Sequence, residues 1–343
     1  MRYVIYGAGA VGGTIGARLY EAGHDVTLIA RGAHLEALRA KGLTFETPAG
    51  ATVLPIPAVG DPGEAGVGPG DVVVLAMKTQ HTAAALDALQ AATTWAPGPA
   101  AGGREVSIVC AQNGVANERM ALRRFAAVYG MCVMLPATHL EPGVVQANGE
   151  PRTGILDLGR YPSGTDATAE AVAAHLEGST FSSRADPAVM RRKYTKLLMN
   201  VSNALDAACG PAARRSGLGH RAREEARACY EAAGIDAASD DEDRERRGDL
   251  VRIAPGARGG SSSWQSLARG TGSIEADYLN GEIVLLGRLH GVPTPVNALL
   301  QRVAGRLARE QRPPGTLPIE ALLDELDELV ELVEHAPQDG PNG

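Results

Sequence analysis

The sequence predicts a two-part α/β protein, with a doubly wound parallel sheet in the first half and an all-α domain in the second. A glycine-rich turn follows an apolar run at the amino terminus, and short apolar runs alternate with helical patterns up to about residue 181. Strand patterns disappear from Pro187 onward. A chain of 343 residues is long enough for two separate cores. We therefore expect domains at residues 1–186 and 187–335 and a disordered tail at 336–343.

The amino-terminal turn has the spacing of a dinucleotide-binding motif. After the apolar run Tyr3–Tyr6, the sequence GAGAVGG has the pattern G-x-G-x-x-G. The first glycine of such a turn permits the bend, the second lets a pyrophosphate approach the backbone, and the third lets the next helix pack on the strand. A helical pattern and a second apolar run at 25–30 complete a βαβ unit, which favours a Rossmann-type fold over a simple loop of small residues. The expected pyrophosphate-binding residues are Gly7, Ala8, Gly9, Ala10, Val11 and Gly12.

The end of the second apolar run indicates which dinucleotide is bound. NAD-dependent enzymes usually have an acidic residue near this point for the ribose 2′-hydroxyl, whereas this run ends in Arg31 with no acid after it. A cation suits the 2′-phosphate of NADP(H), so Arg31 favours that cofactor. A solvated surface arginine is the alternative.

Two later strands end in polar residues. The apolar run at 72–77 is followed by Lys78, and the run at 106–110 is followed shortly by Asn113. Ligands of open α/β sheets bind beyond the carboxyl ends of the strands. We therefore expect Lys78 and Asn113 to lie in the same crevice as the glycine turn.

The predicted helix at 190–209 carries a polar stripe. Lys196, Asn200 and Asn203 stand at i, i+4 and i+7, among leucines and a methionine, so one helix would present them on one face. Buried polar groups need partners, and a bound substrate is one candidate. Desolvation would make the Lys196 proton labile, which suits a general acid. An ordinary amphipathic helix with this face in water is the alternative.

A second cluster contains Ser263, in a serine run, and Glu275, at the start of a periodic helical pattern. A carboxylate there could simply satisfy the helix dipole. Further on, the apolar positions at 319–333 have helical spacing with acids between them. This helix could pack on its own domain or on a partner chain, and the second alternative would make the protein a homodimer.

Composition excludes several classes of function. The net charge of −7 offers no basic face for nucleic acid. The four cysteines are widely separated and the histidines are scattered, so we expect neither a metal site nor a disulfide framework. No apolar run reaches the roughly eighteen residues of a membrane span. We expect a cytoplasmic protein without a membrane or nucleic-acid partner.

Taken together, these segments resemble the ketopantoate reductase (2-dehydropantoate 2-reductase) family over most of the chain. Each motif is moderately specific, and their order along one chain is highly specific. The motifs are GAGAVGG, Arg31, Met77-Lys78, the QNG at 112–114, THLEPG followed by GILDLG, Lys196 with Asn200, the serine run with Glu275, and Asn280-Gly281.

The resemblance implies a reaction and a role for each residue. Hydride from NADPH would reduce the C2 ketone of 2-dehydropantoate, a 2-oxo acid, to give pantoate for pantothenate biosynthesis. Arg31 and Lys78 would hold the 2′-phosphate side of the cofactor, and Asn113 would lie between cofactor and substrate. Lys196 would donate the proton, and Glu275 would hydrogen-bond beside it. The residues expected to contact the substrate are Asn113, Lys196, Asn200, Asn203 and Ser263.

The chain also departs from the family pattern. Ala204 stands where the family usually has another helix asparagine, and DAACGPAARR after it contains no asparagine. Trp264 stands where a methionine is common. A related reductase of another 2-oxo acid, carbonyl or imine is therefore an alternative. A nucleotide-sensing protein without turnover is a third, which Lys196 and Glu275 argue against, because a sensor needs no proton donor.

Overall fold

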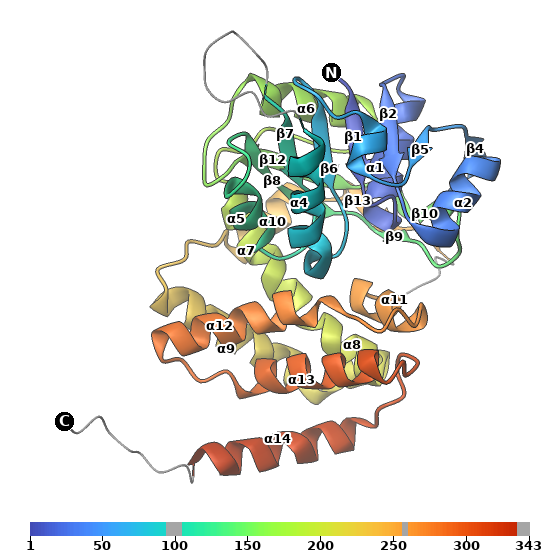
Figure 1. The fold of residues 1–343 in the computed structure, drawn as a ribbon. Helices are drawn as coiled ribbons and strands as arrows, with labels where there is room; N and C mark the ends of the chain where they lie inside the picture. The colour runs from blue at the N-terminus through green and yellow to red at the C-terminus, as the bar shows by residue number, and fades with distance from the viewer. Residues whose placement is uncertain (94–104, 256–259, 335–343) are drawn as a thin grey trace. The chain divides into compact units, whose positions relative to one another are not determined.

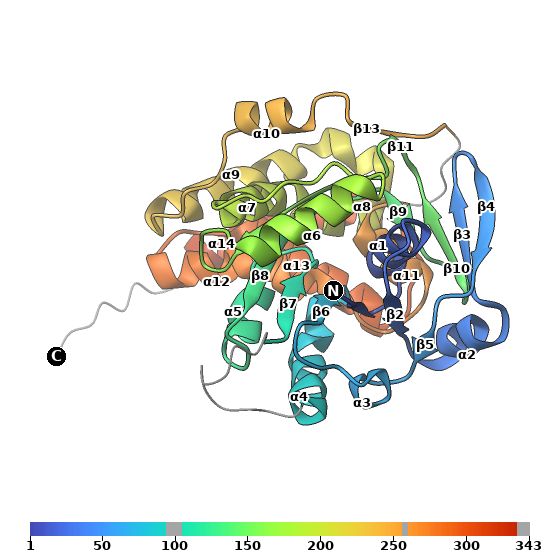
Figure 2. The ribbon, with the colours of Figure 1, turned by 90° about the horizontal axis from the view of Figure 1, so that it is seen from above.

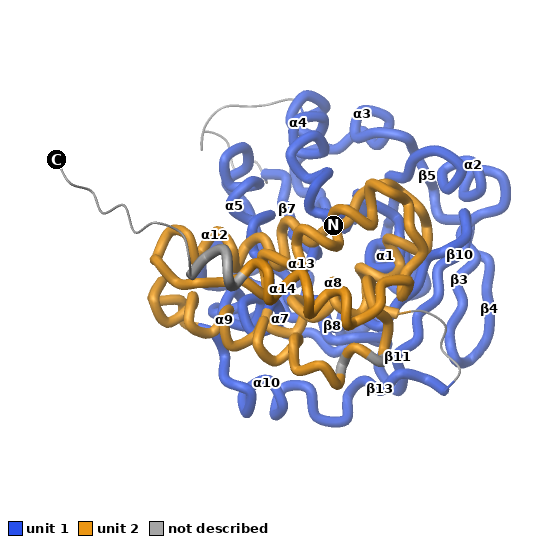
Figure 3. Tube along the Cα trace, turned by 90° about the horizontal axis from the view of Figure 1, so that it is seen from below, with its two compact units in different colours: residues 1–197, 237–259 blue, residues 198–236, 260–343 orange. Residues whose placement is uncertain are grey.

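A computed structural model describes residues 1–93, 105–255 and 260–334, and it divides the chain into two compact units (Figure 3). The first unit comprises Met1–Leu197 and Ala237–Gly259, and the second comprises Leu198–Asp236 and Gly260–Gly343. The expected class, an α/β doubly wound domain and an all-α domain, is confirmed. The tail predicted at 336–343 lies outside the described residues.

The first unit is built around a seven-stranded sheet with the order β12-β8-β7-β6-β1-β2-β5 (Figure 1). Neighbouring strands are parallel, except that β12 is antiparallel to β8. The chain moves outward from β1 to one side and then returns to build the other side, as expected of a doubly wound sheet. The strands are β1 (Tyr3–Tyr6), β2 (Val26–Ile29), β5 (Ala58–Val59), β6 (Val72–Leu75), β7 (Ser107–Cys110), β8 (Val128–Met134) and β12 (Ile155–Arg160).

Both faces of this sheet are covered by helices, because alternate residues of each strand point to opposite sides. Tyr3 and Ile5 of β1 enter the core formed with α1 and α6, whereas Val4 and Tyr6 enter the core formed with α3, α4 and α5. Figure 2 shows α1 and α6 on one side of the sheet and α3 to α5 on the other. These helices are α1 (Ala10–Glu21), α6 (Ala167–Gly178), α3 (Pro62–Ala65), α4 (Thr82–Ala92) and α5 (Asn117–Leu122).

Two smaller sheets complete the strands of the first unit. One has the order β4-β3-β10-β9 and contributes buried side chains to the α1 core, and the other pairs β11 with β13. The helix α2 (Gly32–Lys41) follows β2. The strands are β3 (Leu43–Thr47), β4 (Gly50–Leu54), β9 (Ala137–Thr138), β10 (Val144–Ala147), β11 (Gly149–Pro151) and β13 (Val251–Ile253).

The first unit extends beyond the boundary predicted at 186/187. It includes most of α7 (Val189–Asn200) and the whole of α10 (Asp240–Arg247). Arg246 of α10 explains part of this association, because its Nε and Nη2 donate to the two carboxylate oxygens of buried Asp157 in β12, at 2.7 and 2.6 Å. A bidentate pair of this kind fixes both position and orientation. Lys196, expected in the second domain, consequently belongs to the first unit.

The second unit has only helical regular structure within its described residues. Its longest described helices are amphipathic, and α13 packs against α8, α12 and α14. Leu322 and Leu326 of α14 are buried and Glu325 pairs with Arg306 at 2.6 Å, so the described part of the acidic tail helix packs on its own chain. The helices are α8 (Asn203–Cys209), η2 (Pro211–Ser216), α9 (Leu218–Ala232), α11 (Ser262–Ala268), η3 (Glu275–Tyr278), α12 (Asn280–His290), α13 (Pro295–Arg309) and α14 (Ile319–Glu334).

None of the helices in the described ranges combines the length and the apolar character needed to cross a bilayer. This finding agrees with the hydropathy of the sequence, in which charged residues interrupt every long apolar stretch.

Replacing Arg246 with alanine should lower the free energy of unfolding by about 3 kcal/mol, because it leaves the Asp157 carboxylate buried without its main partner. Arg244→Ala on the same helix is the matched control, since Arg244 pairs with Asp241 in solvent and should cost under about 0.5 kcal/mol. Urea titration of the two variants measures the difference. Equal losses would contradict the anchoring role of Arg246.

Candidate active site

The glycine turn is shaped by close backbone approaches. Gly7 has a φ of +103°, and a Cβ atom there would lie 2.6 Å from the backbone nitrogen of Met77. A Cβ atom at Gly12 would lie 2.2 Å from the carbonyl oxygen of Gly7. The amides of Gly7 and Ala8 both donate to Ile29 O, at 3.0 and 3.3 Å. The fold itself therefore requires the first and third glycines of the motif.

Gly9 differs from the other two glycines. A Cβ atom there would meet only His139 Cδ2 at 3.7 Å, an ordinary van der Waals contact, and its φ is −74°. Gly9 is also the residue before α1, and no side chain among the described residues caps that helix. The unpaired N–H groups and the dipole of the helix favour an anion at this point. The bare backbone at Gly9 thus fits the pyrophosphate of a dinucleotide, which needs close approach.

Four parallel strands end together beside this turn. Tyr6 is in register with Ile29 of β2 on one side and Leu75 of β6 on the other, and Leu75 is in register with Cys110 of β7. The residues that follow these strands therefore meet at one edge of the sheet. That edge carries Gly7, Arg31, Lys78 and Asn113, which the sequence predicted to lie together.

Arg31 is exposed just after β2, at the position that precedes α2. Its Nη2 donates to the hydroxyl of Tyr6 at 3.2 Å, which holds the guanidinium beside the end of β1. Lys78 is partly buried just after β6, before η1 (Thr79–His81). A guanidinium and an ammonium at this edge suit a phosphate on the adenosine ribose.

A buried chain of hydrogen bonds fixes the segment around Asn113. Gln112 Nε2 donates to Thr82 Oγ1 at 3.0 Å, and Thr82 Oγ1 donates to Asn117 Oδ1 at 2.7 Å. Asn117 Nδ2 then donates to Thr79 Oγ1 at 3.1 Å and to Asn113 O at 3.3 Å. This network ties the end of β7 to the turn that follows Lys78, so the polar edge is rigid.

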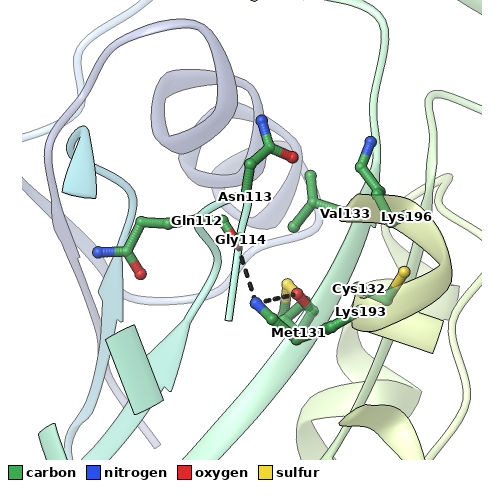
Figure 4. A pocket seen from close by; sticks show the side chains of 8 residues that line it. All are labelled: Gln112, Asn113, Gly114, Met131, Cys132, Val133, Lys193 and Lys196. Atoms are coloured by element: carbon green, nitrogen blue, oxygen red, sulfur yellow. Dashed lines mark hydrogen bonds between the residues drawn. The ribbon is translucent and has the colours of Figure 1, made fainter. Parts of the chain in front are cut away.

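Asn113 and Lys196 line one pocket within the first unit (Figure 4). Figure 4 shows the Asn113 amide and the Lys196 amine extending to the same side. The pocket is formed by the segment after β7, by β8 and by α7. Its lining residues are Gln112, Asn113, Gly114, Met131, Cys132, Val133, Lys193 and Lys196.

The Lys196 ammonium is suited to give up a proton. It is partly buried and has no hydrogen bond or ion pair with any described residue. Burial lowers the pKa of Lys196 below the ordinary lysine value of 10.5, and the positive charges of Lys193 and Arg247 lower it further, while Cys132 and Asp243 act in the opposite direction. The geometry and the lowered pKa both fit a general acid.

The prediction that Lys196, Asn200 and Asn203 share one helix face was wrong for Asn203. The helix α7 ends at Asn200, and α8 begins at Asn203 after a two-residue turn. Asn280 Nδ2 donates to the carbonyl oxygen of Val201 at 2.9 Å in this turn, and the short polar side chains here compete with helical hydrogen bonds. Asn200 itself is buried, and its Oδ1 accepts no hydrogen bond within the described residues.

Ser263 is buried in α11, which is fastened to α8 through Ser261. The Ser261 amide donates to Asp206 Oδ2 at 3.1 Å, and its hydroxyl donates to Asn203 O at 3.3 Å. These bonds bring the segments of Asn203 and Ser263 together within the second unit.

Glu275 is buried, but its local structure differs from the expected one. It begins the short 3-10 helix η3, and the long helix α12 starts only at Asn280. An interaction with the dipole of a long helix therefore does not explain why a carboxylate is buried at position 275.

Two residues of the site were missed by the sequence reasoning. Lys193 lies one turn before Lys196 and forms a 2.7 Å ion pair with Glu118 of α5, and the two side chains are 2% and 0% exposed. The i, i+3 spacing of the two lysines was a usable signal for Lys193. The sequence contained no comparable signal for Glu118, because its partner Lys193 is far away along the chain.

Two family models match the chain. The one described as ketopantoate reductase PanE/ApbA matches residues 3–162, and the one for the C-terminal part of the same family matches residues 188–308. The matches cover the glycine turn, the polar edge of the sheet and Lys196.

Curated relatives and solved structures agree with these matches. A 2-dehydropantoate 2-reductase of Archaeoglobus fulgidus is 30% identical over 317 residues, which are 89% of this chain and 97% of that protein. One of Pyrococcus horikoshii is 30% identical over 200 residues, which are 58% of this chain and only 61% of that relative. A PanE/ApbA family ketopantoate reductase from Ralstonia eutropha JMP134 has a crystal structure that aligns with a TM-score of 0.73 at 28% identity, covering 91% of this chain and 99% of that one.

Alanine substitution should reduce stability at Gly12 and reduce dinucleotide binding at Gly9. Gly12→Ala should lower the free energy of unfolding by about 1–3 kcal/mol, because its Cβ atom overlaps the Gly7 carbonyl. Gly9→Ala should change stability by no more than about 0.5 kcal/mol, yet weaken the binding of a nicotinamide dinucleotide by about tenfold, because the new methyl group occupies the approach to the backbone. Thermal unfolding and calorimetric titration with NADPH measure the two effects. Full NADPH affinity in Gly9→Ala would contradict the placement of the pyrophosphate.

Proposed function

The chain belongs to the ketopantoate reductase family, and on that premise we propose that it is an NADPH-dependent oxidoreductase that reduces 2-dehydropantoate to pantoate. The observation that carries the proposal is the pocket in which Lys196, partly buried and without a partner among the described residues, stands beside Asn113 at the polar edge of a doubly wound sheet. Pantoate formation would serve pantothenate biosynthesis.

The polar edge fits the cofactor. Backbone N–H groups of the glycine turn, from Gly7 to Gly12, would hold the pyrophosphate, and Arg31 with Lys78 would hold the 2′-phosphate. Asn113 would lie between the nicotinamide and the substrate. When bound, NADPH supplies the hydride that reduces the C2 ketone.

Lys196 is the general acid in the proposed reaction. Its ammonium would stabilise the negative charge that develops on the carbonyl oxygen and then transfer a proton to that oxygen, which leaves a neutral amine and the 2-hydroxy acid. The lowered pKa of Lys196 makes this transfer easier. By resemblance to the family, we assign Asn200, Asn203 and Ser263 to substrate binding and Glu275 to catalysis.

A second candidate function is reduction of another 2-oxo acid or a related carbonyl or imine. It is favoured by Ala204, which is 2% exposed and offers no polar group where the family usually has an asparagine. Steady-state NADPH oxidation with 2-dehydropantoate and with a panel of other 2-oxo acids separates the two functions. The higher kcat/KM identifies the substrate, and absence of turnover on every compound would contradict both.

Lys196→Ala should lower kcat by about 10²–10⁴-fold while NADPH binding is retained, because only the proton donor is lost. Lys41→Ala, an exposed lysine on α2, is the control and should leave kcat unchanged. In the wild-type protein, kcat should fall as the pH rises through the pKa of Lys196, below the ordinary lysine value of 10.5, since the neutral amine cannot donate a proton. Undiminished turnover in Lys196→Ala would remove this residue from the mechanism.

Arg31→Ala should raise the KM for NADPH by about tenfold and leave the KM for NADH almost unchanged, because only NADPH has the 2′-phosphate. Arg39→Ala, in the helix that follows Arg31, is the control, since Arg39 already pairs with Glu64 at 2.5 Å. Initial rates with both cofactors provide the comparison. A parallel rise for NADPH and NADH would show that Arg31 does not recognise the phosphate.

A further inference from the structure

Lys193 is a buried lysine whose ammonium lies close to three acceptors. Its Nζ donates to Gln112 O at 2.9 Å and to Met131 O at 3.2 Å, and lies 2.7 Å from Glu118 Oε1. A lysine ammonium has three donors, and three acceptors surround this one. Figure 4 shows it between the two backbone carbonyls, with the Lys196 amine extending away from it.

The two carbonyls belong to different segments that line the pocket. Gln112 directly precedes Asn113 in the segment after β7, and Met131 directly precedes Cys132 in β8. One ammonium therefore bonds to both segments, and it comes from the same helix as Lys196, one turn earlier.

The rest of this arrangement is built around the charge of Lys193. Apart from this ion pair, neither carboxylate oxygen of Glu118 has a partner within the described residues, so the Lys193 ammonium is its counterion. The backbone of β8 passes close to the pair, since a Cβ atom at Gly130 would lie 3.4 Å from both Glu118 Oε1 and Lys193 Cδ and 3.1 Å from Met190 Sδ. A buried ion pair usually adds little to the free energy of unfolding, so stability alone does not explain why this pair is present.

The use of lysine in this chain indicates a role at the candidate site. Only four of the 33 Lys and Arg residues are lysines, namely Lys41, Lys78, Lys193 and Lys196, and all but Lys41 lie at the candidate site. In a chain that uses arginine for nearly every cation, these three positions carry the more compact ammonium instead.

We propose that Lys193, neutralised by Glu118, is a positioning residue that fixes Asn113 and β8 around Lys196 for the proposed reduction. The inference rests on the function proposed above for Lys196. Lys193 also acts through its charge. The pKa of Lys196 is lowered first by burial, and the groups that face it are Cys132 of β8, Lys193 of α7, and Asp243 and Arg247 of α10. Loss of the Lys193 charge therefore raises the pKa of Lys196.

The decisive variant is Lys193→Met combined with Glu118→Gln, which removes both charges and leaves no buried carboxylate unpaired. Its kcat should fall by about tenfold or more with little change in the KM for NADPH, because the lost groups lie away from the phosphate sites. The alkaline limb of its kcat profile should move to higher pH, because the Lys193 charge no longer lowers the pKa of Lys196. Lys41→Met is the matched control. Loss of kcat without any movement of the pH limb would overturn the proposal, since a merely structural defect has that result.

A second variant and a second readout cover the other outcomes. If this double variant does not fold, Lys193→Met combined with Glu118→Leu, which replaces the ion pair with apolar side chains, should lower kcat by about threefold or more at unchanged KM for NADPH, and wild-type kcat there would overturn the proposal. With four lysines, NMR of protein labelled with carbon-13 lysine follows the Lys196 amine directly, assigned by Lys196→Arg. Its pKa should rise in whichever of the two variants folds, and an unchanged pKa would also overturn the inference. This readout needs no turnover, so absence of wild-type activity would refute only the proposed function.

Discussion

Parallel strands bring their carboxyl ends to one edge of a sheet, and the candidate site of this protein depends on that constraint. The register that aligns Tyr6 with Ile29 and Leu75 also aligns the residues that follow these strands. A glycine turn, a guanidinium and an ammonium consequently meet along a short edge, although they are dispersed through the first eighty residues of the chain. Hydrogen bonds from buried Gln112 and Asn117 then hold the next segment in place.

The same edge shows two different uses of a lysine. Lys196 is partly buried and has no partner among the described residues, which leaves its proton available. Lys193, one turn away, has three acceptors and is almost inaccessible to solvent. One helix thus carries both lysines, and the charge of Lys193 contributes to the lowered pKa of Lys196, the proton donor of the proposed reaction.

Much of this arrangement could be predicted from the sequence, because local patterns determine it. The glycine spacing, the apolar strands and the polar residues at their ends were sufficient to infer the fold and to group Gly7, Arg31, Lys78 and Asn113. Contacts between distant segments were not predictable in this way. The bond from Asn280 to Val201 accompanies a helix break that periodicity could not reveal, and the Arg246–Asp157 pair moves the unit boundary past residue 186. The Glu118–Lys193 pair is likewise a contact between segments that are distant in the sequence, and local patterns could not reveal it.

The central claim is that hydride passes from NADPH to C2 of the substrate at this edge. Its most direct test is to incubate the protein with 2-dehydropantoate and NADPH deuterated at nicotinamide C4, in separate reactions for the two faces, and to analyse the product by mass spectrometry and NMR. The account predicts pantoate with deuterium at C2 from one of the two labelled cofactors. Absence of pantoate, or pantoate with no deuterium at C2 from either cofactor, would contradict it.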